Sequence, residues 1–81
     1  MSESRTRVQV IATFALDGKM QPLYVAHEGY TRKILSSYIS HEDFAWITFK
    51  CSIQVEDTVR SITLNYSIKD HLWDMIYTKQ Y

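Results

Sequence analysis

The stretch that decides the fold runs from Ile47 to Ile68 and reads ITFKCSIQVEDTVRSITLNYSI. From Ile47 to Val55, apolar residues at odd positions alternate with polar residues at even positions. The alternation then resumes on the other parity, with apolar residues at Ile62, Leu64, Tyr66 and Ile68. Because side chains on a β-strand point alternately to opposite faces, each half predicts a strand with one buried face.

The change of parity constrains the turn between these two strands. An odd and an even residue can face each other in an antiparallel pair only if the loop has an even number of residues, which excludes a three-residue loop. A two-residue loop at Thr58-Val59 and a four-residue loop over 57–60 give the same register. We expect the longer loop, because Thr58 and Val59 tolerate positive φ poorly. The register then places Val55 opposite Ile62, Ile53 opposite Leu64 and Cys51 opposite Tyr66.

The N-terminal half predicts a second hairpin. Residues 1–4 are polar and are expected to form a flexible N-terminus, and the alternation from Val8 to Leu16 predicts one long strand. Asp17-Gly18 is the strongest short turn signal in the chain, because glycine adopts positive φ without steric cost. A two-residue turn there places Leu23 opposite Ala12 and Val25 opposite Val10.

Proline restricts how the second strand of this hairpin can begin. In the predicted register Pro22 faces Thr13. Because proline has no backbone N–H to donate, the start of this strand should lie at a sheet edge or at a β-bulge.

Two further segments fit either a strand or a helix. In 30–40, Ile34, Leu35, Tyr38 and Ile39 fit a helical face, whereas Tyr30, Ile34 and Tyr38 fit one face of a strand. We favour a strand with a bulge, because Tyr, Thr and Ile are typical of strands and Gly29-Tyr30 is a poor helix N-cap. In 70–77, Asp70 could cap a short helix, but Lys69-Asp70-His71 also fits a turn into a last strand with Trp73, Met75 and Tyr77 on one face, which we favour.

Five or six antiparallel strands with short loops predict a small single-domain all-β fold over residues 5–81. At this size a meander usually curls, because closure removes exposed edges, so we expect an SH3-like half-open barrel. The chain resembles small uncharacterised all-β proteins of clostridia and related bacteria in its Asp17-Gly18 turn, its Pro22–Val25 segment, its Glu28-Gly29-Tyr30 corner and its Phe49-Lys50-Cys51 and Leu64-Asn65-Tyr66 strands. That family has no established activity, so the resemblance implies no functional residue.

Composition narrows the classes of function. The 81 residues allow one domain with a modest core, which buries about 60% of the unfolded surface. The formal net charge is zero, so no overall field steers the protein towards nucleic acid or membrane. The chain shows no signal peptide and no apolar run of about 18 residues, so we expect a cytoplasmic protein without a membrane segment.

Few residues suggest catalysis or metal binding. The single cysteine, Cys51, falls on the buried row of its strand and is interpreted as a core residue. His27, His41 and His71 are each expected in a loop or turn beside carboxylates, with His41-Glu42-Asp43 forming the turn before the central hairpin, but no spacing forces the histidines to converge on one ion. We therefore predict no enzyme, metal or cofactor. The alternative is a small metal-dependent or acid/base enzyme that uses His41, His71 and Asp70.

The exposed aromatic residues instead favour a binding role. Trp46 and Lys50 share the polar parity of their strand, and Tyr24 also points outward. A purely structural interpretation is that Trp46 and Tyr24 cover a second small core. We predict a binding or assembly module whose partner is another protein or a second copy of the chain. The alternative is a weak single-stranded nucleic-acid-binding domain with a site formed by Trp46, Tyr24, Lys50, Arg5 and Arg7.

The oligomeric state can also be predicted from the pattern of charges. Between Gln9 and Leu16 the first strand carries no charge and no proline, so its edge should pair with a partner unless the last strand covers it. We therefore predict a homodimer, with Trp46 or the edge of the first strand at the contact.

Overall fold

The computed structural model describes residues 2–79, and side chains from Arg5 to Ile76, so Met1, Gln80 and Tyr81 lie outside it. Residues 2–79 form antiparallel strands and no helix, which confirms the all-β class. The strands are β1 (Ser2–Val8), β2 (Val10–Phe14), β3 (Met20–His27), β4 (Tyr30–Glu42), β5 (Trp46–Val55), β6 (Thr58–Ser67) and β7 (Leu72–Lys79). There are seven strands, not five or six, because the predicted first strand divides at Gln9.

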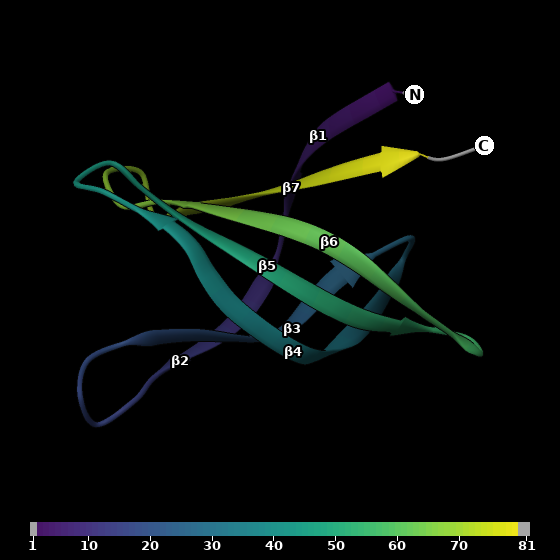
Figure 1. Ribbon diagram of the computed structural model, residues 1–81, viewed down its shortest axis with the longest axis horizontal. Helices are drawn as coiled ribbons and strands as arrows, with labels where there is room; N and C mark the ends of the chain where they lie inside the picture. The colour runs from purple at the N-terminus through teal and green to yellow at the C-terminus, as the bar shows by residue number, and fades with distance from the viewer. Residues whose placement is uncertain (1, 80–81) are drawn as a thin grey trace.

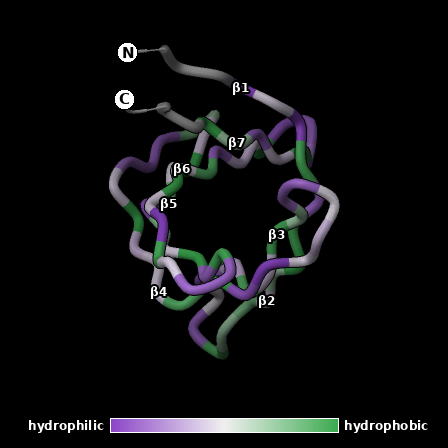
Figure 2. The backbone as a smooth tube through the Cα atoms, turned by 90° about the vertical axis from the view of Figure 1, so that its right-hand side faces the viewer, coloured by the Kyte–Doolittle hydropathy of each residue, from purple (hydrophilic) through white to green (hydrophobic). Residues whose placement is uncertain are grey.

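The strands follow the order β1-β7-β6-β5-β4-β3-β2, and the sheet curls into a half-barrel. Seen along the long axis, the backbone forms a ring (Figure 2). The run from Ser2 to Phe14 joins the two edges of the sheet, because β1 pairs with β7 and β2 pairs with β3. At the bend, the Gln9 carbonyl accepts a hydrogen bond of 3.0 Å from the Ala26 N–H.

The central hairpin keeps the predicted parity but has a different register. Its loop is Glu56-Asp57, and Cys51 faces Ile62 where Tyr66 was predicted, while Ile53 faces Arg60. We expected a four-residue loop over 57–60, and a turn at Glu56-Asp57, which contains no glycine or asparagine, was not among the two loops considered. Glu56 nevertheless adopts φ 55°, and side chains on both sides support the turn. Gln54 Nε2 donates to the Glu56 carbonyl at 2.7 Å, and Thr58 Oγ1 donates to the Val55 carbonyl at 3.1 Å.

The first hairpin also differs in its turn. Ala15 and Lys19 enclose a three-residue loop, in which the Gly18 N–H donates to the Ala15 carbonyl at 2.8 Å and Gly18 has φ 86°. This pattern is typical of a turn closed by one left-handed residue, so the predicted two-residue turn is wrong. Val25 does face Val10, but Leu23 is an extra residue between paired positions, so Ala12 faces Pro22. The bulge expected near the proline is therefore confirmed.

β4 is a long, bulged strand, as predicted for residues 30–40. It pairs with β3 over Tyr30–Lys33 and with β5 from Ile34 onwards. Register shifts leave Leu35 and Ser40 as extra residues. Because bulges bend a strand and increase its twist, they help to curl the sheet. The strand continues to Glu42, so His41 and Glu42 belong to it and not to the predicted turn.

The last segment is a strand, as predicted. β7 follows a turn in which His71 adopts φ 58°, and it lies between β6 and β1. Figure 1 shows β1 and β7 side by side near the two chain ends. Residues 2–4 therefore belong to the sheet rather than to the separate N-terminal segment that we expected. Trp73 and Met75 point inward, whereas the Tyr77 side chain, predicted on the same face, lies outside the described residues.

The core fills the inside of the curled sheet. It contains the inward residues of the central hairpin together with residues from β3, β4 and β7: Val25, Ile34, Phe49, Cys51, Ile53, Val55, Ile62, Leu64, Trp73 and Met75. The Phe49 and Trp73 rings lie 5.7 Å apart, and Tyr66 lies 4.9 Å from Trp73 between ring centroids. In the described part of the chain there is no helix long and apolar enough to cross a membrane.

Candidate binding face

The outer face of β1, β7, β6, β5 and β4 carries the polar parity of the central hairpin. Strand pairing aligns its side chains in rows that run across the strands. One row, here called the Lys50 row, contains Tyr38, Lys50, Thr63, Ile76 and Arg5. The neighbouring row contains Ser36, Ser52 and Ser61. The polar alternation of the sequence therefore becomes a mainly polar surface across five strands, in which Ile76 is the apolar member of the Lys50 row.

A wide trough of about 720 Å³ lies over these two rows. Its polar lining consists of hydroxyl groups and cations: Ser36, Tyr38, Lys50, Ser52, Thr58, Arg60, Ser61 and Thr63. None of the residues that line it is acidic. Because sheets twist and β4 is bulged beneath this region, we attribute the hollow to the curvature of the sheet.

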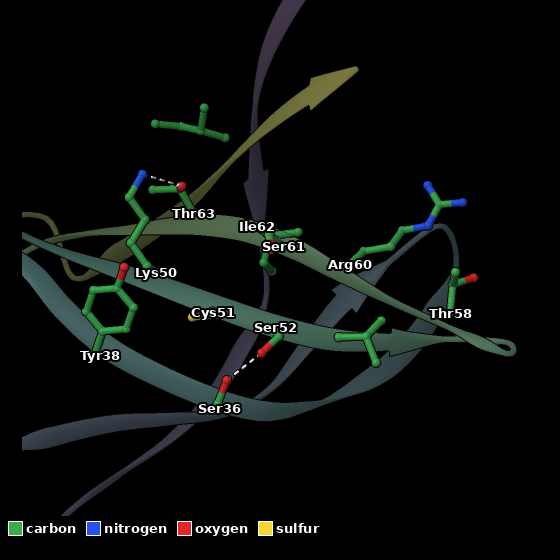
Figure 3. A pocket seen from close by; sticks show the side chains of 12 residues that line it. Ser36, Tyr38, Lys50, Cys51, Ser52, Thr58, Arg60, Ser61, Ile62 and Thr63 are labelled. Carbon is green, nitrogen blue, oxygen red and sulfur yellow. Dashed lines mark hydrogen bonds between the residues drawn. The ribbon is translucent and has the colours of Figure 1, made fainter. Parts of the chain in front are cut away.

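Figure 3 shows how these side chains are arranged. Lys50 Nζ donates a hydrogen bond of 3.1 Å to Thr63 Oγ1, and the hydroxyls of Ser36 and Ser52 are hydrogen bonded to each other. The Tyr38 ring lies next to Lys50, and Arg60 lies at the far end of the trough beside Thr58. The outer face of the trough can therefore offer the Lys50 ammonium group and a set of hydroxyl groups, whereas Arg60, which pairs with the inward Ile53, starts from the other face of β6.

A smaller hollow of about 270 Å³ adjoins the Lys50 row and contains Trp46. Arg5, His41 and Asp43 also line it. Asp43 holds the start of β5, because its carboxylate accepts hydrogen bonds from the N–H groups of Ala45 at 2.8 Å and Trp46 at 2.9 Å. The hydrogen bond from His41, together with those two N–H groups, lowers the pKa of Asp43 to about 2. The charged Asp43 carboxylate therefore holds the backbone of Trp46 in place at the start of β5.

The structure brings four of the five predicted binding residues to this face. Trp46, Lys50, Arg5 and Arg7 all lie on it, on β5 and β1. Arg7 already forms an ion pair, because its Nε lies 2.7 Å from Asp74 Oδ1. Tyr24 is not part of the group: it lies on β3 between Ile11 and Lys33.

The residues of the alternative enzyme hypothesis each have another partner. His41 Nε2 lies 2.9 Å from Asp43 Oδ2, and His71 Nδ1 lies 2.9 Å from the Tyr66 hydroxyl. Asp70 is hydrogen bonded to Ser67. The residues that the structure describes contain no group of three or more His, Cys, Asp or Glu placed to hold a metal ion.

The other two candidates for chemistry are buried. Cys51 lies in the core, and burial raises the pKa of its thiol to about 11, which keeps it protonated at neutral pH. His27 was predicted in a loop but is the buried last residue of β3, with Nε2 3.1 Å from Glu28 Oε1.

A second surface of interest is the free edge of β4. From Ile34 to Glu42, β5 lies on one side of this strand, and within residues 2–79 no strand pairs with the other side. Leu35, Tyr38 and Ile39 are exposed on this segment, and Phe44 is exposed just beyond it. The outer edge of β2 is also unpaired, and exposed Phe14 and Leu16 lie at its end.

Sequence reasoning identified part of this face and missed the rest. The polar parity of 48–54 and 61–65 predicted an outward surface, and Trp46 and Lys50 followed from it. Ser36, Ser61 and Arg60 were not proposed, because their position opposite β5 depends on the register of the strands. The correct register would have required the Glu56-Asp57 turn, which has no glycine to mark it.

Comparison of this chain with protein-family models, curated proteins and solved structures finds no match. The resemblance to small clostridial proteins therefore stays a prediction.

Proposed function

We propose that this protein is a binding and assembly module that pairs with a second copy of itself through the free edge of β4. The observation that carries the proposal is the unpaired side of Ile34–Glu42. An exposed row of backbone N–H and C=O groups is a template for another strand, and natural proteins normally cover or blunt it. Added strands gain main-chain hydrogen bonds, and their side chains provide specificity.

Side chains along this edge support a specific contact. Tyr38 and Ile39 are 66% and 38% exposed, although both lie in the middle of a long strand. Tyrosine is enriched at interfaces because its ring adds apolar area while its hydroxyl remains hydrogen bonded. A partner strand would cover Ile39, which points to the core side of the sheet, and would lie beside Tyr38 without covering the outer face of its ring.

The charges of β4 favour pairing of two copies in antiparallel orientation. Arg32 and Lys33 lie at one end of the strand, Glu42 and Asp43 lie at the other, and residues 34–40 carry no charge. Around a two-fold axis near Tyr38, the cations of one copy would approach the acids of the other at both ends. A closed two-fold contact also avoids the open filament that a head-to-tail contact risks.

We also propose that the curled sheet is an SH3-like barrel and that the protein is cytoplasmic. An SH3-like barrel is supported by the two long runs, 2–14 and 30–42, that each pass from one part of the curled sheet to another. A cytoplasmic location is supported by the single cysteine, which can form no internal disulfide.

A charge-exchange experiment tests the dimer. Sedimentation velocity at about 1 to 100 µM should give a mass near twice the 9.6 kDa of one chain. Lys33→Glu and Glu42→Lys alone should each dissociate the dimer, because each places like charges together at both ends. An equal mixture of the two variants should restore the dimer, because opposite charges then meet at both ends.

Matched substitutions locate the contact. Ile39→Lys should dissociate the dimer, whereas Leu72→Lys, at a residue of similar exposure (41%) beside the Trp46 end, should leave it intact. Dissociation by Leu72→Lys or by Phe14→Lys, with no effect of Ile39→Lys, would move the contact to Trp46 or to β2 and contradict the proposal. A wild-type protein that is monomeric at about 100 µM would overturn self-assembly altogether.

A further inference from the structure

We propose that the trough on the outer face binds single-stranded nucleic acid, with phosphates near Lys50 and a base stacked on Tyr38. This site goes beyond the proposed self-assembly, because it uses a face of the sheet and not the strand edge. It also differs from the site predicted from sequence, which included Tyr24 and Arg7 but not Tyr38 or the serine row.

The local charge of the face supports an anionic ligand, although the whole protein is neutral. Lys50 and Arg60 line the trough, and Arg5 continues the Lys50 row onto β1. Lys50 donates one hydrogen bond, to Thr63 Oγ1, and because an ammonium group has three N–H donors, it can also donate to a ligand. Affinity for phosphate chains depends on such a cluster of cations on one surface and not on the net charge of the protein.

The acids on this face lie outside the trough or already have partners. Asp74 forms an ion pair with Arg7 at 2.7 Å, and Asp43, which is hydrogen bonded to His41 at 2.9 Å, does not line the trough. Glu56 and Asp57 lie in the turn between β5 and β6 and do not line the trough. Repulsion of a phosphate chain within the trough is therefore small.

Aromatic rings are placed where bases could stack. Tyr38 is 66% exposed and faces Lys50 across the strand pair, so a stacked base and a bound phosphate would be neighbours. Trp46 is exposed in the adjoining hollow with Arg5. Stacking on aromatic rings beside a cationic groove is the usual way in which proteins bind single strands without sequence preference.

The dimensions and the hydroxyl groups fit an extended chain. At about 4.8 Å per strand, the Lys50 row spans roughly 19 Å from Tyr38 to Arg5. The hydroxyls of Ser36, Ser52 and Ser61 line the trough in the row beside it. Hydroxyl groups donate to phosphate oxygens and also accept from sugar hydroxyls, so they suit a sugar–phosphate backbone.

Fluorescence anisotropy with a labelled oligothymidylate of about 16 nucleotides tests the proposal. At low salt we expect a Kd between about 1 and 100 µM. The logarithm of the affinity should fall with the logarithm of the salt concentration with a slope near −1.4, because about two cations, Lys50 and Arg5, contact phosphate. Quenching of Trp46 fluorescence should accompany binding, since Trp73 is buried.

Matched variants separate stacking from general attraction. Tyr38→Ala should weaken binding about five- to 150-fold, whereas Tyr30→Ala, at a residue of nearly the same exposure (67%) on the other part of the sheet, should change it less than twofold. Lys50→Gln should weaken binding at least about fivefold and reduce the salt slope by about 0.7, whereas Lys19→Gln in the β2–β3 turn should not.

Three outcomes would overturn the proposal. The first is no anisotropy change up to about 100 µM protein at low salt. The second is equal effects of Tyr38→Ala and Tyr30→Ala. The third is binding of heparin as tight as that of the oligonucleotide and equally insensitive to Tyr38→Ala, which would indicate a general polyanion surface. The Lys33→Glu variant should bind like the wild type, because Lys33 does not line the trough.

Discussion

Ile53→Ala is the most direct test of the fold, because this side chain lies at the middle of the core. Ile53 is 0% exposed and faces Ile34 across one strand pair and Arg60 across the other. The substitution removes roughly three buried CH₂ equivalents at about 0.8 kcal/mol each, or about 2.4 kcal/mol. A residual cavity of about 60 Å³, at ~24 cal/mol per Å³, adds about 1.4 kcal/mol. The expected loss in the free energy of unfolding is therefore about 4 kcal/mol.

Equilibrium urea unfolding at one fixed protein concentration measures this loss, because self-association would shift the apparent stability. In a thermal scan the same loss should lower the Tm by about 16 to 30 °C. Val59→Ala is the control, because Val59 is exposed near the end of β6 and should cost less than about 0.5 kcal/mol. If Ile53→Ala does not fold, Ile53→Val should still cost about 0.5 to 1.5 kcal/mol. A loss below about 1 kcal/mol for a folded Ile53→Ala would refute the placement of Ile53 in the core.

Three further predictions concern single residues. Gly18→Val should lower the free energy of unfolding in urea by about 1 to 2 kcal/mol, because Gly18 has φ 86° and a side chain resists this conformation; a loss no greater than that of Gly18→Asn would contradict it. The folded pKa of Asp43 is lowered to about 2, so the stability that its carboxylate contributes is present above the unfolded pKa near 3.9 and is lost as pH falls towards 2; an NMR titration midpoint above about 3.5 would be inconsistent with its hydrogen bonds. The Cys51 thiol, with its pKa raised to about 11 by burial, should react with a thiol reagent at pH near 8 only after urea unfolding, and rapid reaction of the folded protein would show that the core opens there.

The turns of the first and the central hairpin show where local sequence rules fail. Asp17-Gly18 marked the first turn correctly, but a three-residue loop formed because only Gly18, and not Asp17, adopts positive φ. The Glu56-Asp57 turn carried no glycine, and its supporting hydrogen bonds come from Gln54 and Thr58. Turn residues therefore located a turn, but side-chain contacts selected the loop length and with it the register.

Local sequence patterns likewise predicted only part of the candidate binding face. The outward positions of Trp46 and Lys50 follow from the alternation, because the period of a strand fixes which face a side chain occupies. The presence of Ser36, Ser61 and Arg60 in the same trough does not follow, because these residues lie on other strands. Tyr24 and Lys50 have the same outward orientation in the sequence pattern, yet the order of the strands places them apart.

By itself, the sequence determined the all-β class, a bulged strand over 30–40, the final strand, and the inward residues of the central hairpin. These features depend on the two-residue period of the strand and on the backbone preferences of Gly18 and Pro22, which act locally. Only the tertiary structure decided that residues 2–14 bend at Gln9 to join both edges of the sheet, that β7 covers β1, and that one side of β4 stays unpaired. The physical reason is that strand order and register are set by contacts between residues far apart in the chain, which no local pattern encodes.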